Sequence, residues 1–255
     1  MRTSPRNGPH RRQRRHPDNA AAMSEVANVQ LTETPIRDAA CLVVVDTSGP
    51  EPTLLMGRRH ADQVFLPDKW VFPGGRVEEE DRALAGRFGG AFTPADLAHE
   101  IRPFALAAVR ELCEETGLVI GTKSPFTHQS AAWETFAASG HSPAPAELLP
   151  FARAITPPGR VRRYDTWFFA AKANAVSGNY APPDGELLDL DWFTISKAAD
   201  LDLPRITRHV LDDVAALLLE DPEINGTREL LPFYYSAESA YRRDLISCKV
   251  APPPP

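Results

Sequence analysis

The hydrophobic positions of this 255-residue chain alternate between short β-type runs and two longer segments with helical spacing. Residues 39–45 form an unbroken apolar run, which predicts a strand covered on both faces. A Gly-Pro turn separates this run from residues 53–58, which predict a returning strand. Further strands are predicted at residues 70–72, 148–155, 166–171 and 187–193, and an irregular or helical excursion at 121–146. The pattern indicates an α/β domain.

Residues 103–116 and 205–219 carry the two helical patterns. With about 100° of turn per residue, the apolar residues of each segment gather on one side, which suits a core contact. In the first segment these residues are Leu106, Val109, Leu112, Cys113 and Thr116, and in the second they are Ile206, Val210, Val214, Leu217 and Leu218. Gly117 follows the first segment, where a left-handed residue is expected to end the helix.

The opposite side of the first helix gathers three carboxylates, Glu111, Glu114 and Glu115. Residues three and four apart share a helix face, so these side chains are expected to project in one direction. Carboxylates this close raise one another's pKa unless a cation lies among them. Hard divalent ions such as Mg²⁺ prefer oxygen ligands of this kind, which indicates a metal site. The alternative is an ordinary solvated face, since charged residues make up about a quarter of a typical chain.

The wider sequence around these acids resembles the Nudix box. Residues 110–118 match its second half (Arg-Glu-apolar-x-Glu-Glu-x-Gly-apolar), and the Phe-Pro-Gly-Gly run at 72–75 matches its usual beginning. Asp81 stands six residues after the second glycine, where the family usually has Glu. The box looks split by a 21-residue insertion at 82–102, as in the long-insert branch of the family. The acidic run 78–81 is interpreted either as support for the metal site or as a solvated turn.

The resemblance implies a Nudix-type α/β/α sandwich with a mixed sheet, and a site that uses Mg²⁺ or Mn²⁺. It implies metal-ligand roles for Glu111, Glu114, Glu115 and the carbonyl of Gly75. Arg110 is expected to orient a ligand Glu or the Gly75 loop, because a guanidinium can hold a carboxylate at two points. Many family members take a general base from a loop outside the box. Glu186 is the candidate here, and the alternative is an exposed turn acid.

By the same resemblance, the expected function is a pyrophosphohydrolase that cleaves a nucleoside diphosphate linked to another moiety. Hydrolysis of a phosphoanhydride needs charge neutralisation on the phosphates and an activated water. A coenzyme A diphosphatase is the first alternative, disfavoured because Asp68 stands where that specificity is associated with glycine. A non-catalytic ligand-binding module of the same fold is the second alternative. Such modules usually lose box glutamates, and all three are present here.

Substrate-binding residues are expected among aromatic side chains, which stack on bases, and arginines, which pair with phosphates. The candidates are Arg58, Trp70, Arg76 and Arg163, and further pocket residues are Phe65, Tyr164, Arg160 and Arg162. Each of them is equally explained as the edge of the core or as surface charge.

Charge is distributed unevenly along the chain. The formal net charge is −6, but residues 1–17 contain six arginines and no acid, which leaves −12 for residues 18–255. A body this acidic argues against broad nucleic-acid binding. The Arg-rich arm is expected to be disordered. It could contact nucleic acid or a membrane, resemble a transit peptide, or not be translated if synthesis starts at Met23.

The expected division of the chain is a disordered arm at 1–35, a Nudix hydrolase domain at 36–222 and a C-terminal extension at 223–255. No apolar run approaches the length of a membrane span, so no membrane partner is expected. The three cysteines, Cys41, Cys113 and Cys248, are widely spaced, which argues for a reducing, cytoplasmic compartment. The expected partner is a small nucleotide-type substrate, and a homodimer is considered as well.

Overall fold

The computed structural model describes residues 34–64, 66–87, 99–127, 130–178, 186–226, 228–238 and 240–249. The Arg-rich arm, Phe65, much of the predicted insertion and the terminal prolines lie outside these residues.

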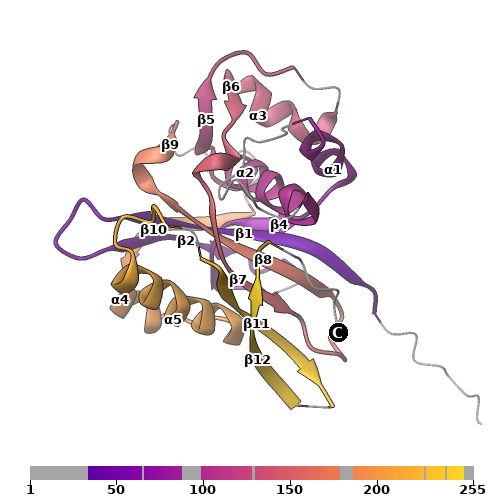
Figure 1. Ribbon diagram of the computed structural model, residues 1–255, viewed down its shortest axis with the longest axis vertical. Helices are drawn as coiled ribbons and strands as arrows, with labels where there is room; N and C mark the ends of the chain where they lie inside the picture. Colours follow the sequence, from indigo (N-terminus) through magenta and orange to yellow (C-terminus); the bar gives the residue numbers. More distant parts are fainter. Residues whose placement is uncertain are drawn as a thin grey trace, which may run out of the picture. The chain divides into compact units, whose positions relative to one another are not determined.

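Nine strands in the described part of the chain form one mixed sheet (Figure 1). In spatial order, the main strands are β10 (Leu187–Thr194), β2 (Thr53–Arg59), β1 (Ile36–Asp46), β8 (Arg163–Lys172), β7 (Leu149–Ile155), β11 (Leu230–Ala237) and β12 (Ala240–Ser247). The short strands β3 (Trp70–Val71) and β4 (Gly74–Arg76) pair with β2 and β1 respectively. β1 is parallel to β8 and β7 is parallel to β11, so the predicted mixed sheet is confirmed.

Helices cover both faces of the sheet, as Figure 1 shows. Leu42 and Val44 of β1 belong to the core cluster that contains α2 (Arg102–Thr116), whereas Val43 and Val45 belong to the cluster that contains α5 (Arg205–Glu220). All four side chains are almost completely buried. α1 (Glu79–Ala85) contacts α2, and α4 (Ile195–Ala199) contacts α5. The unbroken apolar run of β1 thus produced the expected strand between two helical layers.

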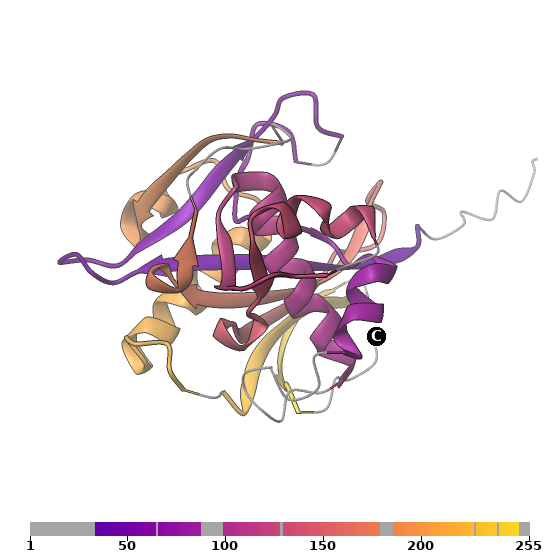
Figure 2. The same ribbon diagram turned by 90° about the horizontal axis from the view of Figure 1, so that it is seen from above.

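The predicted excursion at 121–146 contributes to a small three-stranded sheet in the order β6 (His141–Pro143), β5 (Val119–Lys123) and β9 (Val176–Ser177), of which β9 lies outside the excursion. A 3-10 turn at Ala131–Trp133 and the short helix α3 (Glu134–Ala138) complete it. Seen from above, this unit and the magenta α2 lie over the indigo strand β1 (Figure 2). None of the described helices combines the length and apolar character that a membrane span requires.

Three elements differ from the sequence expectation. The acidic run at 78–81, interpreted as support for the metal site or as a solvated turn, forms the beginning of helix α1. The predicted C-terminal extension supplies β11 and β12, and Phe233 of β11 pairs with Arg153 of β7 in the same sheet. β12 is mostly exposed at the sheet edge and carries polar residues on both faces, so its hydrophobic signal is weak. The division of the chain at residues 35 and 222 stays a prediction.

Candidate active site on the acidic helix

Helix α2 has clear local signals at both ends. Pro103 lies in the first turn, where its missing N–H removes no helical hydrogen bond. Gly117 ends the helix with a φ of 74°, and its N–H donates to the carbonyl of Cys113 at 2.8 Å. The predicted apolar side, including Leu112 and Cys113, is buried. The acidic residues of the last turns are therefore held in a fixed register against the sheet.

The Pro-Gly-Gly turn contacts the acidic helix directly. The N–H of Gly74 donates to Oε2 of Glu115 at 2.8 Å. A Cβ atom on Gly75 would lie 2.4 Å from the carboxylate of Glu111, so a larger residue could not keep this approach. Both glycines belong to β4, which pairs with β1. The sheet thus brings the Gly75 strand and two of the three acids together.

Arg110 lies between the acids and is almost completely buried. Its Nη1 donates to Oε1 of Glu111 at 2.9 Å and to Oε2 of Glu114 at 2.7 Å. Its Nη2 donates to the backbone carbonyl of Arg76 at 2.8 Å. One guanidinium therefore holds two candidate ligands and the strand that follows Gly75.

Asp81 is the buried partner on the other side of Arg110. Its carboxylate is fully buried and accepts from Nε of Arg110 at 3.0 Å and from Nη2 at 2.9 Å. The backbone N–H of Glu78 also donates to it, at 2.9 Å, across the first turn of α1. Glu79 and Glu80 are exposed. The acidic run is thus divided: Asp81 supports Arg110, and the two neighbouring acids face solvent.

Burial dominates the electrostatics of the acids. It raises the pKa of Glu111 to about 7, with a further increase from the charge of Glu114 that is opposed by Arg110. Burial also raises the pKa of Glu115 well above its usual value, and the charge of Glu111 adds to this. Loss of solvent is thus a larger cause of the raised pKa values than the repulsion between carboxylates that the sequence predicts. A site with this excess of negative charge is suited to a cation.

The family is decided by a match over most of the chain. The sequence profile of the NUDIX domain matches residues 35–214. This protein belongs to the Nudix family. Family membership implies hydrolysis of phosphoanhydride bonds, with pyrophosphohydrolase activity on nucleoside diphosphate derivatives.

A solved structure with a similar fold agrees with this assignment. A NUDIX hydrolase from Alicyclobacillus acidocaldarius is 26% identical, with a TM-score of 0.58 over 72% of this chain and 92% of that chain. A MutT protein from Bacillus halodurans is 15% identical, with a TM-score of 0.45 over 82% of this chain and 98% of that chain. The NUDIX domain of NrtR from Shewanella oneidensis, solved with ADP ribose, is 12% identical, with a TM-score of 0.45 over 72% of this chain and 90% of that chain. No curated protein sequence matches the chain significantly.

Nudix hydrolases generally use divalent metals, and the donor set of this protein fits such an ion in chemistry and charge. Glu111, Glu114 and Glu115 offer hard carboxylate oxygens beside the Gly75 strand, in a region that burial has made unfavourable for uncompensated negative charge. Across the described ranges, however, no three His, Cys, Asp or Glu side chains form a ready-made ligand cluster. The guanidinium of Arg110 bridges Glu111 and Glu114 instead.

Glu186, the candidate general base, lies in the same neighbourhood as the Nudix acids. Its charge contributes to the raised pKa of Glu115, which indicates that the two carboxylates face a common region. Its side chain is about half exposed, and its Oε2 lies 4.0 Å from Nη2 of Arg59. The structure therefore places Glu186, from a loop far along the chain, beside Arg59 and close enough for its charge to act on Glu115.

Arg59 is a residue of this site that the sequence reading missed. Its side chain is 14% exposed, and its charge lowers the pKa values of both Glu115 and Cys41. Burial, with the nearby acids, outweighs this effect and raises the pKa of Cys41 to about 12. The signal was present in strand alternation, because Arg59 shares a face of β2 with Leu55, which belongs to the α2 cluster.

The other predicted substrate residues are not gathered at the acids. Arg58 points to the opposite face of β2 and pairs with Asp189 at 2.5 Å and Asp68 at 3.2 Å. Trp70 packs edge-on against Phe193, with ring centroids 4.9 Å apart, and borders the α5 cluster. Arg163 is buried and donates to the carbonyl of Thr156 at 3.1 Å. Tyr164 is half-buried, whereas Arg160 and Arg162 are exposed.

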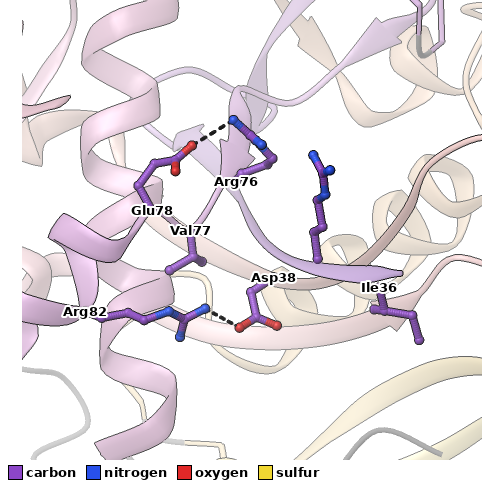
Figure 3. Close-up of a pocket in the computed structure, with 7 residues that line it drawn as sticks. Ile36, Asp38, Arg76, Val77, Glu78 and Arg82 are labelled. Atoms are coloured by element: carbon purple, nitrogen blue, oxygen red, sulfur yellow. Dashed lines mark hydrogen bonds and ion pairs between the residues drawn. The ribbon is translucent and has the colours of Figure 1, made fainter. Parts of the chain in front are cut away.

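Arg76 lines a polar pocket of about 270 Å³ whose other lining residues come from β1, α1 and the two residues before α1 (Figure 3). Arg76 pairs with Glu78 at 3.0 Å, and Arg82 pairs with Asp38 of β1 at 2.5 Å, as the dashed lines in Figure 3 mark. The second pair fastens α1 to β1, and the first fastens β4 to the residue that precedes α1. Both pairs therefore help to hold the segment that carries Asp81.

Proposed function

We propose that this Nudix hydrolase is a Mg²⁺- or Mn²⁺-dependent pyrophosphohydrolase that cleaves a nucleoside diphosphate linked to another moiety. The proposal rests on the hydrogen bonds that buried Arg110 donates to Glu111, to Glu114 and to the strand that contains Gly75. A solvated acidic face would leave its carboxylates mobile. Here they are held in one orientation, as preorganised ligands require.

Glu111, Glu114, Glu115 and the carbonyl of Gly75 would hold the metal. When bound, a divalent ion neutralises phosphate charge and lowers the pKa of a coordinated water. Arg110 keeps Glu111 and Glu114 aligned, and the Gly74 N–H fixes the orientation of the Glu115 carboxylate. The protein thereby supplies orientation, which contributes much of the rate in phosphoryl transfer.

Glu186 is the proposed general base, with its carboxylate accepting the proton of the attacking water. Its partial exposure and its position near Glu115 suit that role. Arg59 is proposed to bind a substrate phosphate, since it is the cation of β2 that faces the acids. A phosphate would then draw Arg59 toward the substrate from its present contact with Gln63 at 3.1 Å.

The test is a substrate panel of dinucleotides, nucleotide sugars, ADP-ribose, coenzyme A and nucleoside triphosphates, assayed with Mg²⁺ and with Mn²⁺. Turnover is expected for a nucleoside diphosphate derivative, with release of a nucleoside monophosphate, and excess chelator should abolish it. Hydrolysis of coenzyme A alone would favour the coenzyme A diphosphatase instead. Binding without turnover across the panel would indicate a ligand-binding module and overturn the proposal.

The three cysteines also support a cytoplasmic location. Cys41, Cys113 and Cys248 form no disulfide in the described part of the chain. Disulfides are rare in proteins of a reducing compartment. Fluorescent tagging of the full-length chain in its own cells would test the location.

A further inference from the structure

The carboxylate of Asp81 is fully buried and receives four hydrogen bonds. Two come from Arg110 and one from the backbone of Glu78. The fourth comes from the indole Nε1–H of Trp133, which donates to Oδ1 of Asp81 at 3.1 Å. Trp133 lies 52 residues further along the chain, outside the Nudix box. A residue of the excursion thus completes the surroundings of a residue of the box.

The indole of Trp133 is held firmly by its own segment. It ends the 3-10 turn Ala131–Trp133, whose first residues are capped by the side chain of Ser130. The ring packs edge-on against Phe126 and Phe136, with centroid distances of 5.5 Å and 5.3 Å. Trp133 is 1% exposed. A buried indole N–H without an acceptor would cost free energy of folding. The hydrogen bond to Asp81 satisfies this donor within an otherwise apolar aromatic cluster.

A chain of direct contacts connects Trp133 to the acids. Trp133 and Nε of Arg110 share Oδ1 of Asp81, and Nη1 of the same Arg110 holds Glu111 and Glu114. The terminal torsion of an aspartate is broad, so its own rotamer preference does not fix the plane of the carboxylate. That plane is held by its four donors, of which Trp133 is the one that comes from neither Arg110 nor the Nudix box. A carboxylate that receives two bonds from one guanidinium in turn restrains the tilt of the Arg110 fork.

We propose that Trp133 is a positioning residue for the metal-binding carboxylates, acting through Asp81 and Arg110. The inference rests on the proposed metal-dependent function. It assigns the excursion between β5 and β7 a role in that site, in addition to its contribution to the core. Loss of the indole donor is expected to loosen Arg110 and hence the orientation of Glu111 and Glu114, without removing any metal ligand.

A purely structural role for Trp133 makes a different prediction, and Trp167 provides the matched control. Trp167 is also 1% exposed and belongs to the same core cluster, where it lies against Phe104 and the guanidinium of Arg153. Its replacement removes a similar apolar volume but leaves the Asp81 network in place. The two tryptophans therefore separate packing from positioning.

The experiment compares wild type, Trp133→Phe and Trp167→Phe for Mn²⁺ binding by calorimetry with the metal alone, for urea unfolding, and for kcat and KM. Trp133→Phe should raise the Mn²⁺ dissociation constant about 10-fold and lower kcat by a similar factor, the lower range for groups that orient metal ligands. KM for the nucleotide substrate should change less than about twofold, because no substrate contact is removed. Trp167→Phe should lower stability but keep the Mn²⁺ affinity of wild type.

Wild-type Mn²⁺ affinity in Trp133→Phe would overturn the inference while leaving the proposed function intact. A wild-type protein that binds no Mn²⁺ would overturn both. If Trp133→Phe does not fold, site-specific replacement of Trp133 by benzothienylalanine keeps the ring size and removes the N–H donor. Unchanged Mn²⁺ affinity in that protein overturns the inference, and a weakened affinity with wild-type stability supports it.

Discussion

Gly75 approaches Glu111 so closely that a methyl group on its α-carbon would lie 2.4 Å from the Glu111 carboxylate. Gly75 belongs to β4 and Glu111 to α2, so this contact joins the two halves of the split Nudix box. The glycine leaves room for the carboxylate beside the backbone of residue 75. A metal shared by that carboxylate and the Gly75 carbonyl, as proposed, depends on this approach.

Gly75→Ala is therefore expected to affect activity far more than stability. The atoms that the new methyl meets are the carboxylate end of the Glu111 side chain, so the clash displaces that carboxylate from Arg110 rather than the backbone of the fold. A displacement of about 1 Å in a catalytic group can lower the rate roughly 100-fold. The rate on the best substrate should fall by about that factor, while the free energy of unfolding changes by less than about 1 kcal/mol. Gly49→Ala, where the nearest atom is 3.7 Å away, is the control.

Glu114→Gln and Glu115→Gln should each lower kcat by at least about 100-fold, because they remove metal-binding charge rather than core contacts. Circular dichroism and unfolding curves should show that both variants remain folded. Glu80→Gln removes an exposed acid from α1 and should retain the wild-type rate. A rate for either box variant within a few-fold of wild type would contradict the proposed ligand set.

Arg59 and Arg58 form a matched pair on opposite faces of one strand. Arg59→Ala should lower kcat/KM about 10- to 100-fold, because a charged hydrogen bond to a phosphate contributes roughly 1.5–3 kcal/mol. Arg58→Ala should change kcat/KM by less than about threefold, since its partners are Asp68 and Asp189 and its exposed ion pairs contribute little. Steady-state kinetics on both variants checks the pair, and equal losses would contradict the assignment of Arg59 to the site.

The buried carboxylate of Asp213, on α5, predicts a pH dependence of the free energy of unfolding. Burial raises the pKa of Asp213, although hydrogen bonds from Tyr234 and Arg243 partly oppose the shift. A raised pKa in the folded state means that protonation favours folding. The contribution of Asp213 is therefore fully present below its ordinary pKa of about 3.9 and is lost as the pH rises through the folded value.

The asparagine side chain in Asp213→Asn cannot ionise, so this variant should lack the pH-dependent contribution of Asp213 to stability. The stability of wild type relative to Asp213→Asn should fall as the pH rises from about 4 toward neutrality. Urea unfolding across that range measures the difference. Asp212→Asn, which replaces the exposed neighbour, is the control and should retain most of the wild-type dependence, because the charge of Asp212 is the smallest cause of the Asp213 shift. Parallel curves for Asp213→Asn and wild type would contradict the shift.

The pattern of hydrophobic residues predicted those helices and strands that bury one or both of their own faces. The strands from 39–45 to 187–193 and the helices at 103–116 and 205–219 were all found, because period-2 and period-3.6 spacing reflects burial directly. β12 was missed because an exposed edge strand such as Ala240–Ser247 has no buried face to mark. Arg58 rather than Arg59 was predicted to bind substrate. The alternation of side chains along β2 distinguishes the two, because Arg59 shares the face of Leu55 and Arg58 does not.

The sequence by itself determined that Glu111, Glu114 and Glu115 would share a helix with Arg110, since the helical repeat is local and needs no other part of the chain. It also determined that Gly117 would end that helix. Only the tertiary structure decided that Arg110 and Trp133, which lie 29 and 52 residues along the chain from Asp81, both donate to the Asp81 carboxylate. It also decided that Glu186 lies near Glu115. Such contacts depend on how distant elements pack. Burial then lowers the local dielectric, so the charged groups orient one another more strongly than they would at the surface.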